Sequence, residues 1–398
     1  MHTDIDVVVV GGGPAGATAA ERLARTGVSV VLLDRSGRIK PCGGAIPSRL
    51  IDEFAVPETL VRARISVTRF IPPSARAVDM EIESGYLAVV DRDAFDEHLR
   101  VRAAEAGALR VEGIFTALMR DGNGNAIVHY CNDKGEATFR ARMVIGADGA
   151  RSVVARQALR APNVKTVLAY QEIIDAPDDN PAFDGARCDL YYGGNISPDF
   201  YAWVMPRGDR ASVGVSTAQR GLSLRQAVRD LRAATGLAGL PTHRTEGAPV
   251  PLEPLRRWDN GRDVVVIGDA AGVVAPCWGE GIYYAMASGA IAGEEVARAL
   301  ATGRARPLGD IRRRFMKMHG SAFALLGLMQ RFSYGSDRQR ERFVSMCADP
   351  QVRHIALDAY FHKRLLGRGW VAYVRVVARD FIAALVRTVR PLKDTKRA

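Results

Sequence analysis

The segment that most constrains this chain is VVVVGGGPAG at Val7–Gly16, where a run of four valines ends in a glycine-rich turn. A helix rich in alanine is expected over Ala17–Arg25, and a second strand over Val28–Leu33 closes on Asp34. Strand, glycine turn, helix, strand and terminal acid together are typical of the βαβ unit that binds dinucleotides. The alternative is a tight turn in an α/β fold that binds no ligand.

The glycines of this turn have distinct expected tasks. Gly11 allows the tight turn, Gly13 allows the backbone to approach a pyrophosphate, and Gly16 allows the helix to pack close to the sheet. The N–H groups and the dipole at the start of the helix hold phosphates. Asp34, 18 residues after Gly16, is placed to accept hydrogen bonds from a ribose diol. The cofactor-binding residues expected in this unit are Gly11, Gly13, Pro14, Ala15, Gly16, Asp34 and Arg35.

Two later strands each end in a pair of glycine and aspartate. One leads to Asp148-Gly149 and the other to Gly268-Asp269, at the edge where open α/β sheets bind ligands. The alternative is that both acids cap helices. With the first glycine turn, and in this order, the pairs resemble the flavoprotein hydroxylase and reductase superfamily. That resemblance implies that Asp269 holds the ribityl chain of FAD and that Asp148 lies in the doublet associated with FAD and the nicotinamide donor.

Composition limits the partners and the compartment. The 398 residues carry a formal net charge of +11, which favours anionic partners such as phosphates or a lipid surface. No basic run is interleaved with aromatic residues, so nucleic acid is not expected. The five cysteines are widely spaced without a C-x-x-C pair, which argues against disulfides and zinc, and no metal is expected. The first strand begins within a few residues of Met1 and no apolar run reaches about 18 residues, so we expect a cytoplasmic chain without a signal peptide or membrane span.

The order of the expected elements predicts a mixed α/β fold with a discontinuous cofactor domain. A Rossmann-like FAD-binding domain of the flavoprotein hydroxylase and reductase type takes residues 1–163 and 256–311. Residues 164–255, with alternating segments broken by Gly, Asn and Pro, predict an antiparallel-sheet substrate domain. A helix is expected over Asp91–Gly107 and a strand pair within Ile65–Val90. A helical region is expected over 312–398.

Three further motifs resemble the geranylgeranyl reductase family over nearly the whole chain. They are KPCGGAIP at Lys40–Pro47, YAWVMP at Tyr201–Pro206 and PCWGEGIYYA at Pro276–Ala285. The first is most similar to the chlorophyll and bacteriochlorophyll branch. Met205 stands where the family usually has Phe, a change of similar bulk, and Trp278 stands where a small residue is expected.

The same motifs indicate how a flavin is held. Gly279 and Gly281 bracket a turn before a helix that starts at Ile282, and backbone N–H groups there can receive the pyrimidine edge of the ring. The Cys42-Gly43-Gly44 segment lets the backbone pass closely over the ring. For Cys42 the alternative is a small residue in a tight loop. For Arg92 a flavin contact and a surface ion pair are equally plausible.

Candidate catalytic residues follow from the expected chemistry. Tyr201 and Trp203 share one face of a strand and can form an aromatic wall against an isoprenoid chain, the alternative being plain core packing. Hydride addition to an isolated double bond requires a positioned acid or water in a dry site. Cys42, Tyr201, Cys277 and Glu280 are candidates for that acid, and the sequence does not rank them.

The family resemblance implies an FAD-dependent reductase that converts a geranylgeranyl group to phytyl with NADPH as the donor. The acceptor would be geranylgeranyl-bacteriochlorophyll(ide), geranylgeranyl diphosphate, or both. The alternatives are an aromatic monooxygenase on the same fold and a non-catalytic flavoprotein that docks on membranes. A flavin halogenase is disfavoured because it requires a second Trp where Tyr201 stands.

The segment Trp370–Val389 predicts a basic amphipathic helix. Arg375, Arg379 and Arg387 fall on one arc, and Trp370 and Phe381 fall on the apolar side. Such a helix can lie in a lipid interface, so we expect peripheral association with a photosynthetic membrane. The alternative is a helix that packs on the body of the protein.

Overall fold

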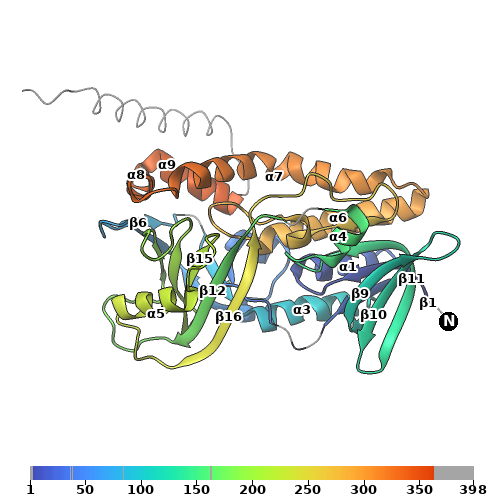
Figure 1. Cartoon of the computed structure of the whole chain (residues 1–398), viewed down its shortest axis with the longest axis horizontal. Helices are drawn as coiled ribbons and strands as arrows, with labels where there is room; N and C mark the ends of the chain where they lie inside the picture. Colours follow the sequence, from blue (N-terminus) through green and yellow to red (C-terminus); the bar gives the residue numbers. More distant parts are fainter. Residues whose placement is uncertain (1–2, 36, 38, 84, 162–163, 363–398) are drawn as a thin grey trace, which may run out of the picture.

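A computed structural model describes residues 3–35, 37, 39–83, 85–161 and 164–362 (Figure 1). The central sheet has seven strands, of which the order β8-β2-β1-β11-β17 runs parallel. β10 and β9 continue from β11 as an antiparallel extension. The strands of this sheet are β1 (Thr3–Val10), β2 (Val30–Asp34), β8 (Leu109–Glu112), β9 (Ile114–Arg120), β10 (Ala126–Asn132), β11 (Gly135–Gly146) and β17 (Val264–Val266).

Valine-rich β1 lies in the middle of the parallel part, with Val8 paired to Val31 on one side and to Val144 on the other. Because both faces of such a sheet are covered, its strands are continuously apolar. The helices of this unit are α1 (Pro14–Ala24), α3 (Arg92–Glu105), α4 (Val153–Leu159) and α6 (Ile282–Thr302). A Cβ on Gly289 of α6 would lie 2.3 Å from the carbonyl oxygen of Ala15, so only glycine permits the close packing of α6 on α1.

The second sheet also has seven strands, in the order β16-β12-β15-β14-β13-β5-β6, and the short helix α5 (Leu224–Ala234) covers one of its faces. Its strands are β5 (Val67–Ile71), β6 (Val78–Glu81), β12 (Thr166–Asp175), β13 (Arg187–Tyr191), β14 (Ala202–Pro206), β15 (Arg210–Thr217) and β16 (Thr242–Pro251). Ala202 and Val204 point to α5, so the alternate positions Trp203 and Met205 point to the other face.

The segment between α1 and α3 is more divided than the expected strand pair. β5 and β6 join the edge of the second sheet, and β13 pairs with β5 in parallel, so this sheet is antiparallel except at that one pair. β3 (Ala45–Pro47), β7 (Leu87–Val90) and β4 (Val61–Ile65) form a small antiparallel sheet between the two larger ones. The helical turns α2 (Ser48–Glu53) and η1 (Glu58–Leu60) complete this segment.

The C-terminal helices lie across both units (Figure 1). α7 (Arg306–Ser333) runs beside α6 and begins before Arg312, where the helical region was expected. α8 (Asp337–Cys347), α9 (Pro350–Leu357) and η3 (Asp358–His362) then reach the second sheet. No helix in the described ranges is long and apolar enough to cross a bilayer. The expected amphipathic helix Trp370–Val389 lies outside the described residues.

Candidate functional site

The glycine turn after β1 has the geometry of a phosphate cradle. Gly11 has a φ of +107°, and a Cβ there would lie 2.3 Å from the carbonyl oxygen of Ala147. A Cβ on Gly16 would lie 1.9 Å from the carbonyl oxygen of Gly11. At Gly13, by contrast, a Cβ would meet no described atom within 4 Å, and this residue is the N-cap of α1. The free N–H groups at the start of α1 therefore point into open space. This arrangement fits a bound pyrophosphate.

Asp34 closes β2 beside this turn, as expected for a ribose acceptor. Burial raises the pKa of its carboxyl, against the opposing effects of the Gly12 N–H and the Arg100 guanidinium. Gly12 has a role that the sequence reasoning missed, because a Cβ there would lie 2.7 Å from Asp34 Oδ2. Arg100 also contacts Asp34, with its Nη1 3.4 Å from Oδ2. Arg35 is exposed just after the strand.

The two Gly-Asp pairs have different roles. Asp148 caps α4: its carboxylate accepts from the N–H groups of Val153 at 2.6 Å and Val154 at 3.1 Å, and from the hydroxyl of Ser152. The helix-capping alternative thus describes Asp148, and neither Asp148 nor Gly149 lines the pocket described next. Asp269 does line it, 2.5 Å from the Nζ of Lys40.

Gly268 allows the strand end to lie against α1. It has a φ of +58°, and a Cβ there would lie 2.7 Å from the Cβ of Ala15. Ala15 is itself buried at the start of α1. These two residues set the approach of Asp269 to the glycine turn.

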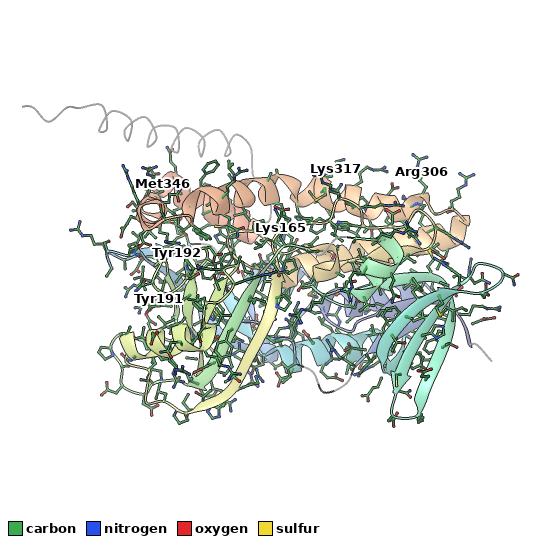
Figure 2. The ribbon with its side chains drawn as sticks, viewed as in Figure 1. Lys165, Tyr191, Tyr192, Arg306, Lys317 and Met346 are labelled. Atoms are coloured by element: carbon green, nitrogen blue, oxygen red, sulfur yellow. The ribbon has the colours of Figure 1, made fainter. Side chains whose placement is uncertain are left out.

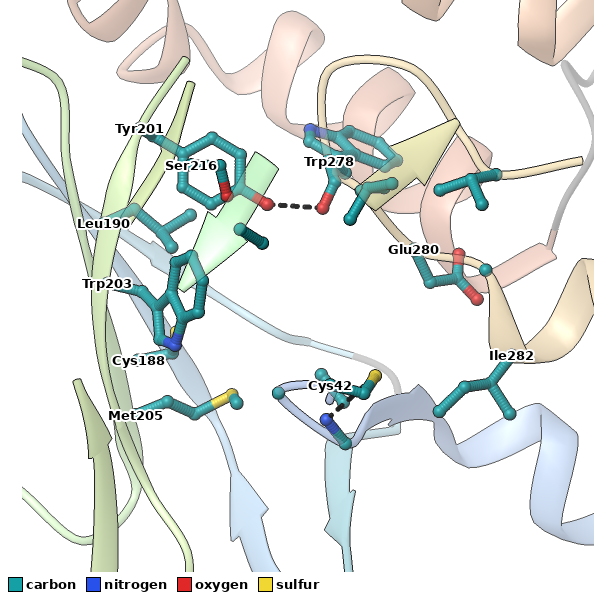
Figure 3. Close-up of a pocket in the computed structure, with 18 of the residues that line it drawn as sticks. Cys42, Cys188, Leu190, Tyr201, Trp203, Met205, Ser216, Trp278, Glu280 and Ile282 are labelled. Atoms are coloured by element: carbon teal, nitrogen blue, oxygen red, sulfur yellow. Dashed lines mark hydrogen bonds between the residues drawn. The ribbon is translucent and has the colours of Figure 1, made fainter. Parts of the chain in front are cut away.

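A large pocket lies between this cofactor cradle and the second sheet (Figure 3). Pro14, Lys40, Asp269 and Ile282 line its cradle side. Leu190, Tyr201, Trp203 and Met205 line its sheet side, and the figure shows these side chains directed across the space toward Cys42, Glu280 and Ile282.

Tyr201 and Trp203 are half-buried neighbours on the pocket wall, with ring centroids 6.2 Å apart. Tyr201 precedes the first residue of β14, and its hydroxyl donates to the carbonyl oxygen of Trp278 at 2.5 Å. Trp278, the departure from the expected small residue, packs on Tyr360 of η3 with ring centroids 5.1 Å apart. The large ring therefore joins the turn before α6 to the C-terminal helices.

The Cys42-Gly43-Gly44 loop is held from the second sheet. The carbonyl of Cys42 accepts from Gln171 Nε2 at 3.0 Å, and that of Gly43 accepts from Arg207 Nη1 at 2.9 Å. Gly44 has a φ of +79°, and a Cβ there would lie 2.1 Å from the carbonyl oxygen of Val90. Sequence reasoning missed Gln171 and Arg207, because residues so distant in sequence carry no local signal for this contact.

Met205 and Arg92 lie on either side of the loop. A Cβ on Gly43 would lie 2.8 Å from Met205 Cε, so the methionine packs directly on the loop. Arg92 forms an ion pair with Asp96, Nη2 to Oδ2 at 2.6 Å, but it is only 2% exposed and lines the pocket. The ion pair of the second alternative is therefore formed, but it is buried and does not lie at the surface. Burial alone lowers the pKa of Arg92, but Asp96 and the Cys42 thiol outweigh it and raise the pKa.

The start of α6 presents N–H groups to the pocket, with Gly281 as its N-cap and Ile282 as its first residue. Gly279 contributes differently from what was expected: its φ is +66° and its N–H donates to the carbonyl of Ala275 at 3.0 Å. Gly279 thus shapes the turn, and the N–H groups available to bind a flavin edge are those of Gly281 and Ile282. Glu280 is buried and lines the pocket.

Cys277 is not brought to the pocket. Its thiol is fully buried 2.9 Å from the Tyr334 hydroxyl, and burial raises its pKa to about 12. It has a φ of +69°, which serves the turn before α6. As a thiol that faces away from the reacting space, Cys277 is removed from the candidate acids.

The far end of the pocket is apolar and is built by the C-terminal helices. The residues there, which sequence reasoning missed, are Met329, Phe343, Cys347, Val352, Leu357, Tyr360 and Phe361. Their helices were expected, but helical periodicity does not show which neighbour a helix covers.

Comparisons with known proteins agree with this geometry. The family model described as lycopene cyclase protein matches residues 6–349. Geranylgeranyl diphosphate reductase of Rhodobacter capsulatus is 49% identical over 90% of this chain and 92% of its own length. The chain belongs to the geranylgeranyl reductase family. A chloroplastic geranylgeranyl diphosphate reductase of Oryza sativa is 38% identical over 96% of this chain and 86% of its own length.

The fold agrees as well. A geranylgeranyl bacteriochlorophyll reductase-like protein of Thermoplasma acidophilum superposes with a TM-score of 0.76 at 21% identity, covering 92% of this chain and 98% of that one. The expected fold class, a Rossmann-like unit with a second sheet and a helical C-terminal region, is therefore confirmed.

Proposed function

We propose that the chain is an FAD-dependent reductase that saturates isolated double bonds of a geranylgeranyl group to give phytyl. The observation that carries the proposal is the pocket itself, which joins a dinucleotide cradle to a long aromatic and apolar chamber. Its acceptor is geranylgeranyl-bacteriochlorophyll(ide), geranylgeranyl diphosphate, or both. The names of the relatives support an oxidoreductase acting on CH–CH groups.

The cradle residues fit FAD. Gly13 and the start of α1 leave open space that would take its pyrophosphate, Asp34 would accept from a ribose, and Asp269 beside Lys40 would hold the ribityl chain. FAD supplies hydride chemistry when bound. The N–H groups at Gly281 and Ile282, with the dipole of α6, stabilise negative charge at that edge of the pocket.

The remaining residues orient the prenyl chain and exclude water. Tyr201 and Trp203 offer ring surface on one side, and the C-terminal helices close the far end with apolar side chains. Among the candidate acids, the Tyr201 hydroxyl already donates a hydrogen bond to the backbone carbonyl of Trp278, and burial raises the pKa of its phenol. Cys42 and Glu280 remain the side chains placed to move a proton in this space.

NADPH is the proposed electron donor. The sequence has no second glycine fingerprint opening a βαβ unit, so the donor visits the flavin transiently. Stopped-flow mixing with NADPH is expected to bleach the flavin. If a reduced ferredoxin bleaches the flavin and NADPH does not, the electron donor is a ferredoxin and the assignment of NADPH is wrong.

We also propose that the protein is cytoplasmic and associates peripherally with a photosynthetic membrane. Support comes from the outer face of α7, where Arg306 and Lys317 point away from the body (Figure 2). Farther along that helix, Leu328 is 44% and Phe332 is 60% exposed. A helix that exposes cations along one part and apolar groups along another is suited to an anionic lipid interface.

Pigment analysis of a deletion strain tests the function in the cell. Loss of this reductase is expected to leave geranylgeranyl-esterified pigment in place of the phytyl ester. A normal phytyl ester in the deletion strain would contradict the proposal. The monooxygenase alternative requires a small polar pocket for a phenol, which the long apolar chamber does not favour.

A further inference from the structure

Four residues form one row across the pocket face of the second sheet. Trp203 on β14 pairs with Gly214 on β15, Gly214 pairs with Gln171 on β12, and Gln171 pairs with Glu246 on β16. Side chains at paired positions project to the same face of a sheet, and Trp203, Gln171 and Glu246 all line the pocket. A Cβ on Gly214 would lie 2.2 Å from Trp203 Cζ2, so the indole lies across this glycine.

Hydrogen bonds join this row to the loop over the cofactor site. Trp203 Nε1 donates to Ser212 Oγ at 3.0 Å, and Ser212 Oγ donates to Gln171 Oε1 at 2.9 Å. Gln171 Nε2 donates to the carbonyl of Cys42 at 3.0 Å and to Glu246 Oε2 at 2.6 Å. Arg244 pairs with the other oxygen of Glu246. An unbroken chain thus runs from the aromatic wall to the backbone of Cys42.

The chemistry of the groups determines which one donates and which one accepts in each of these hydrogen bonds. The indole N–H of Trp203 can only donate, so the Ser212 hydroxyl accepts from it and directs its own proton to Gln171. The Cys42 carbonyl and the Glu246 carboxylate can only accept, so the amide nitrogen of Gln171 must face both. Ser212 and Gln171 are buried, and a flipped amide would leave buried groups without partners, which is costly. This series of hydrogen bonds therefore has a single arrangement of donors and acceptors.

We propose that Gln171 is a positioning residue that holds the prenyl-facing wall and the Cys42 loop in one fixed relation. Its side chain spans the two sides of the reacting space: one end fixes Trp203 through Ser212, and the other fixes the Cys42 backbone. This assignment rests on the proposed function. Displacement of a reacting group by about 1 Å can lower a rate by about a hundredfold, so a residue that holds both sides affects turnover more than binding.

The test compares Ser212→Ala and Gln171→Leu with the wild-type holoenzyme. Ser212→Ala cuts the bond to Trp203 by removing one oxygen atom and leaves the cofactor cradle untouched. The matched control is Gln226→Leu on α5, whose side-chain amide bonds the exposed Asp230 and Arg229 of the same helix. With geranylgeranyl diphosphate, we expect both test variants to lower kcat by about ten- to a hundredfold and to change KM little, with wild-type FAD content. Gln226→Leu should behave as wild type.

Two further measurements separate positioning from a merely structural role. Ser212→Ala and Trp203→Phe cut the same link, so their losses in kcat should not add in the double variant. In addition, titration of oxidised holoenzyme with geranylgeranyl diphosphate should perturb the flavin absorbance of the wild type, and the perturbation should be lost in Ser212→Ala.

The outcomes are distinct. Wild-type kcat and an unchanged flavin perturbation in both test variants would overturn the assignment to Gln171. The assignment would also be overturned if kcat fell only in proportion to a loss of bound FAD or of thermal stability. If the wild type itself reduces no prenyl substrate, the proposed function fails, and the flavin titration still tests the link.

Discussion

At the scale of single residues, the glycines of the first turn differ in what a side chain would meet. Gly11 and Gly16 exclude one because backbone carbonyls lie where Cβ would be, whereas Gly13 faces open space. A glycine in open space needs another reason for its place. The binding of a pyrophosphate would explain it, since a phosphate must approach the backbone closely.

Gly13→Val is therefore expected to abolish FAD binding while the chain still folds. Gly122→Val is the matched control, because a Cβ on Gly122 also meets nothing within 4 Å but lies in a distant turn. Flavin absorbance of the purified variants measures the effect, with circular dichroism as the check on folding. Stoichiometric FAD in Gly13→Val would contradict the cradle.

Asp91 predicts a pH dependence of stability. Burial by itself raises the pKa of its carboxyl, but Arg207 and Arg62 outweigh it and hold the pKa below the usual value. A lowered folded-state pKa adds stability that is present above about pH 4 and is lost as the pH falls through the folded pKa. The contribution is about 1 kcal/mol, since Asp91 is partly exposed and solvent screens the pair.

Chemical unfolding from pH 7 down to pH 2.5 tests this. The free energy of unfolding of the wild type should fall more steeply below about pH 4 than that of Asp91→Asn. Asp178→Asn, a change of the same type at an exposed position, should keep the wild-type slope. Identical slopes in the wild type and Asp91→Asn would show that the Arg207 and Arg62 pairs contribute no net stability.

Residue-level prediction from sequence succeeded where the neighbours are local. The glycine turn and Asp34 follow from one continuous segment, so their geometry was predictable. Asp148 was assigned to the cofactor from the same kind of doublet, but Ser152 and Val153, only a few residues later, make it a helix cap. Cys277 shares a motif with Gly281, yet its left-handed φ turns the thiol toward Tyr334. A motif gives residue types and order, not side-chain direction.

At the scale of elements, β14 separates a core face from a pocket face. Ala202 and Val204 pack on α5, while Trp203 and Met205 face the pocket. Trp203→Ala should therefore lower the rate of alkene reduction by about a hundredfold and leave the rate of flavin reduction by the donor near wild type. Single-turnover kinetics of each half-reaction measures the two effects. If the rates of both half-reactions fell equally, or if the variant protein were insoluble, Trp203 would be a core residue and not part of the prenyl site.

Element boundaries were predictable to within a few residues because hydrophobic periodicity is a local signal. The helix expected from Asp91 and the helix expected from Ile282 are α3 and α6. The sheet to which β5 and β6 belong was not predictable. β5 and β6 leave the cofactor unit for the second sheet, and α8, α9 and η3 close the pocket, because long-range pairing depends on the whole chain.

At the scale of the whole molecule, the net charge of +11 and the exposed face of α7 predict binding to anionic vesicles. A Leu328→Ser/Phe332→Ser variant should bind less, since it removes exposed apolar area. The control is Ile114→Ser/Met119→Ser, which changes exposed apolar residues of β9 on another part of the surface. Sedimentation with vesicles measures the bound fraction.

Salt dependence completes this prediction. Raising the salt from about 0.1 M to about 1 M shortens electrostatic reach from about 10 Å to about 3 Å, so binding of the wild type should weaken. If the two double variants bound vesicles equally well, α7 would not be part of the lipid-binding surface. Loss of binding only on truncation before Trp370 would assign the interface to the C-terminal segment.

On the proposed function, a flavin held in the cradle reduces isolated double bonds of a prenyl chain that lies in the apolar chamber. Mass spectrometry of geranylgeranyl diphosphate after anaerobic incubation with the reduced holoenzyme tests it most directly. We expect products that have gained two hydrogen atoms for each double bond reduced, with one flavin reoxidised for each of these additions. An unchanged prenyl mass, together with flavin reoxidation only when oxygen is admitted, would contradict it.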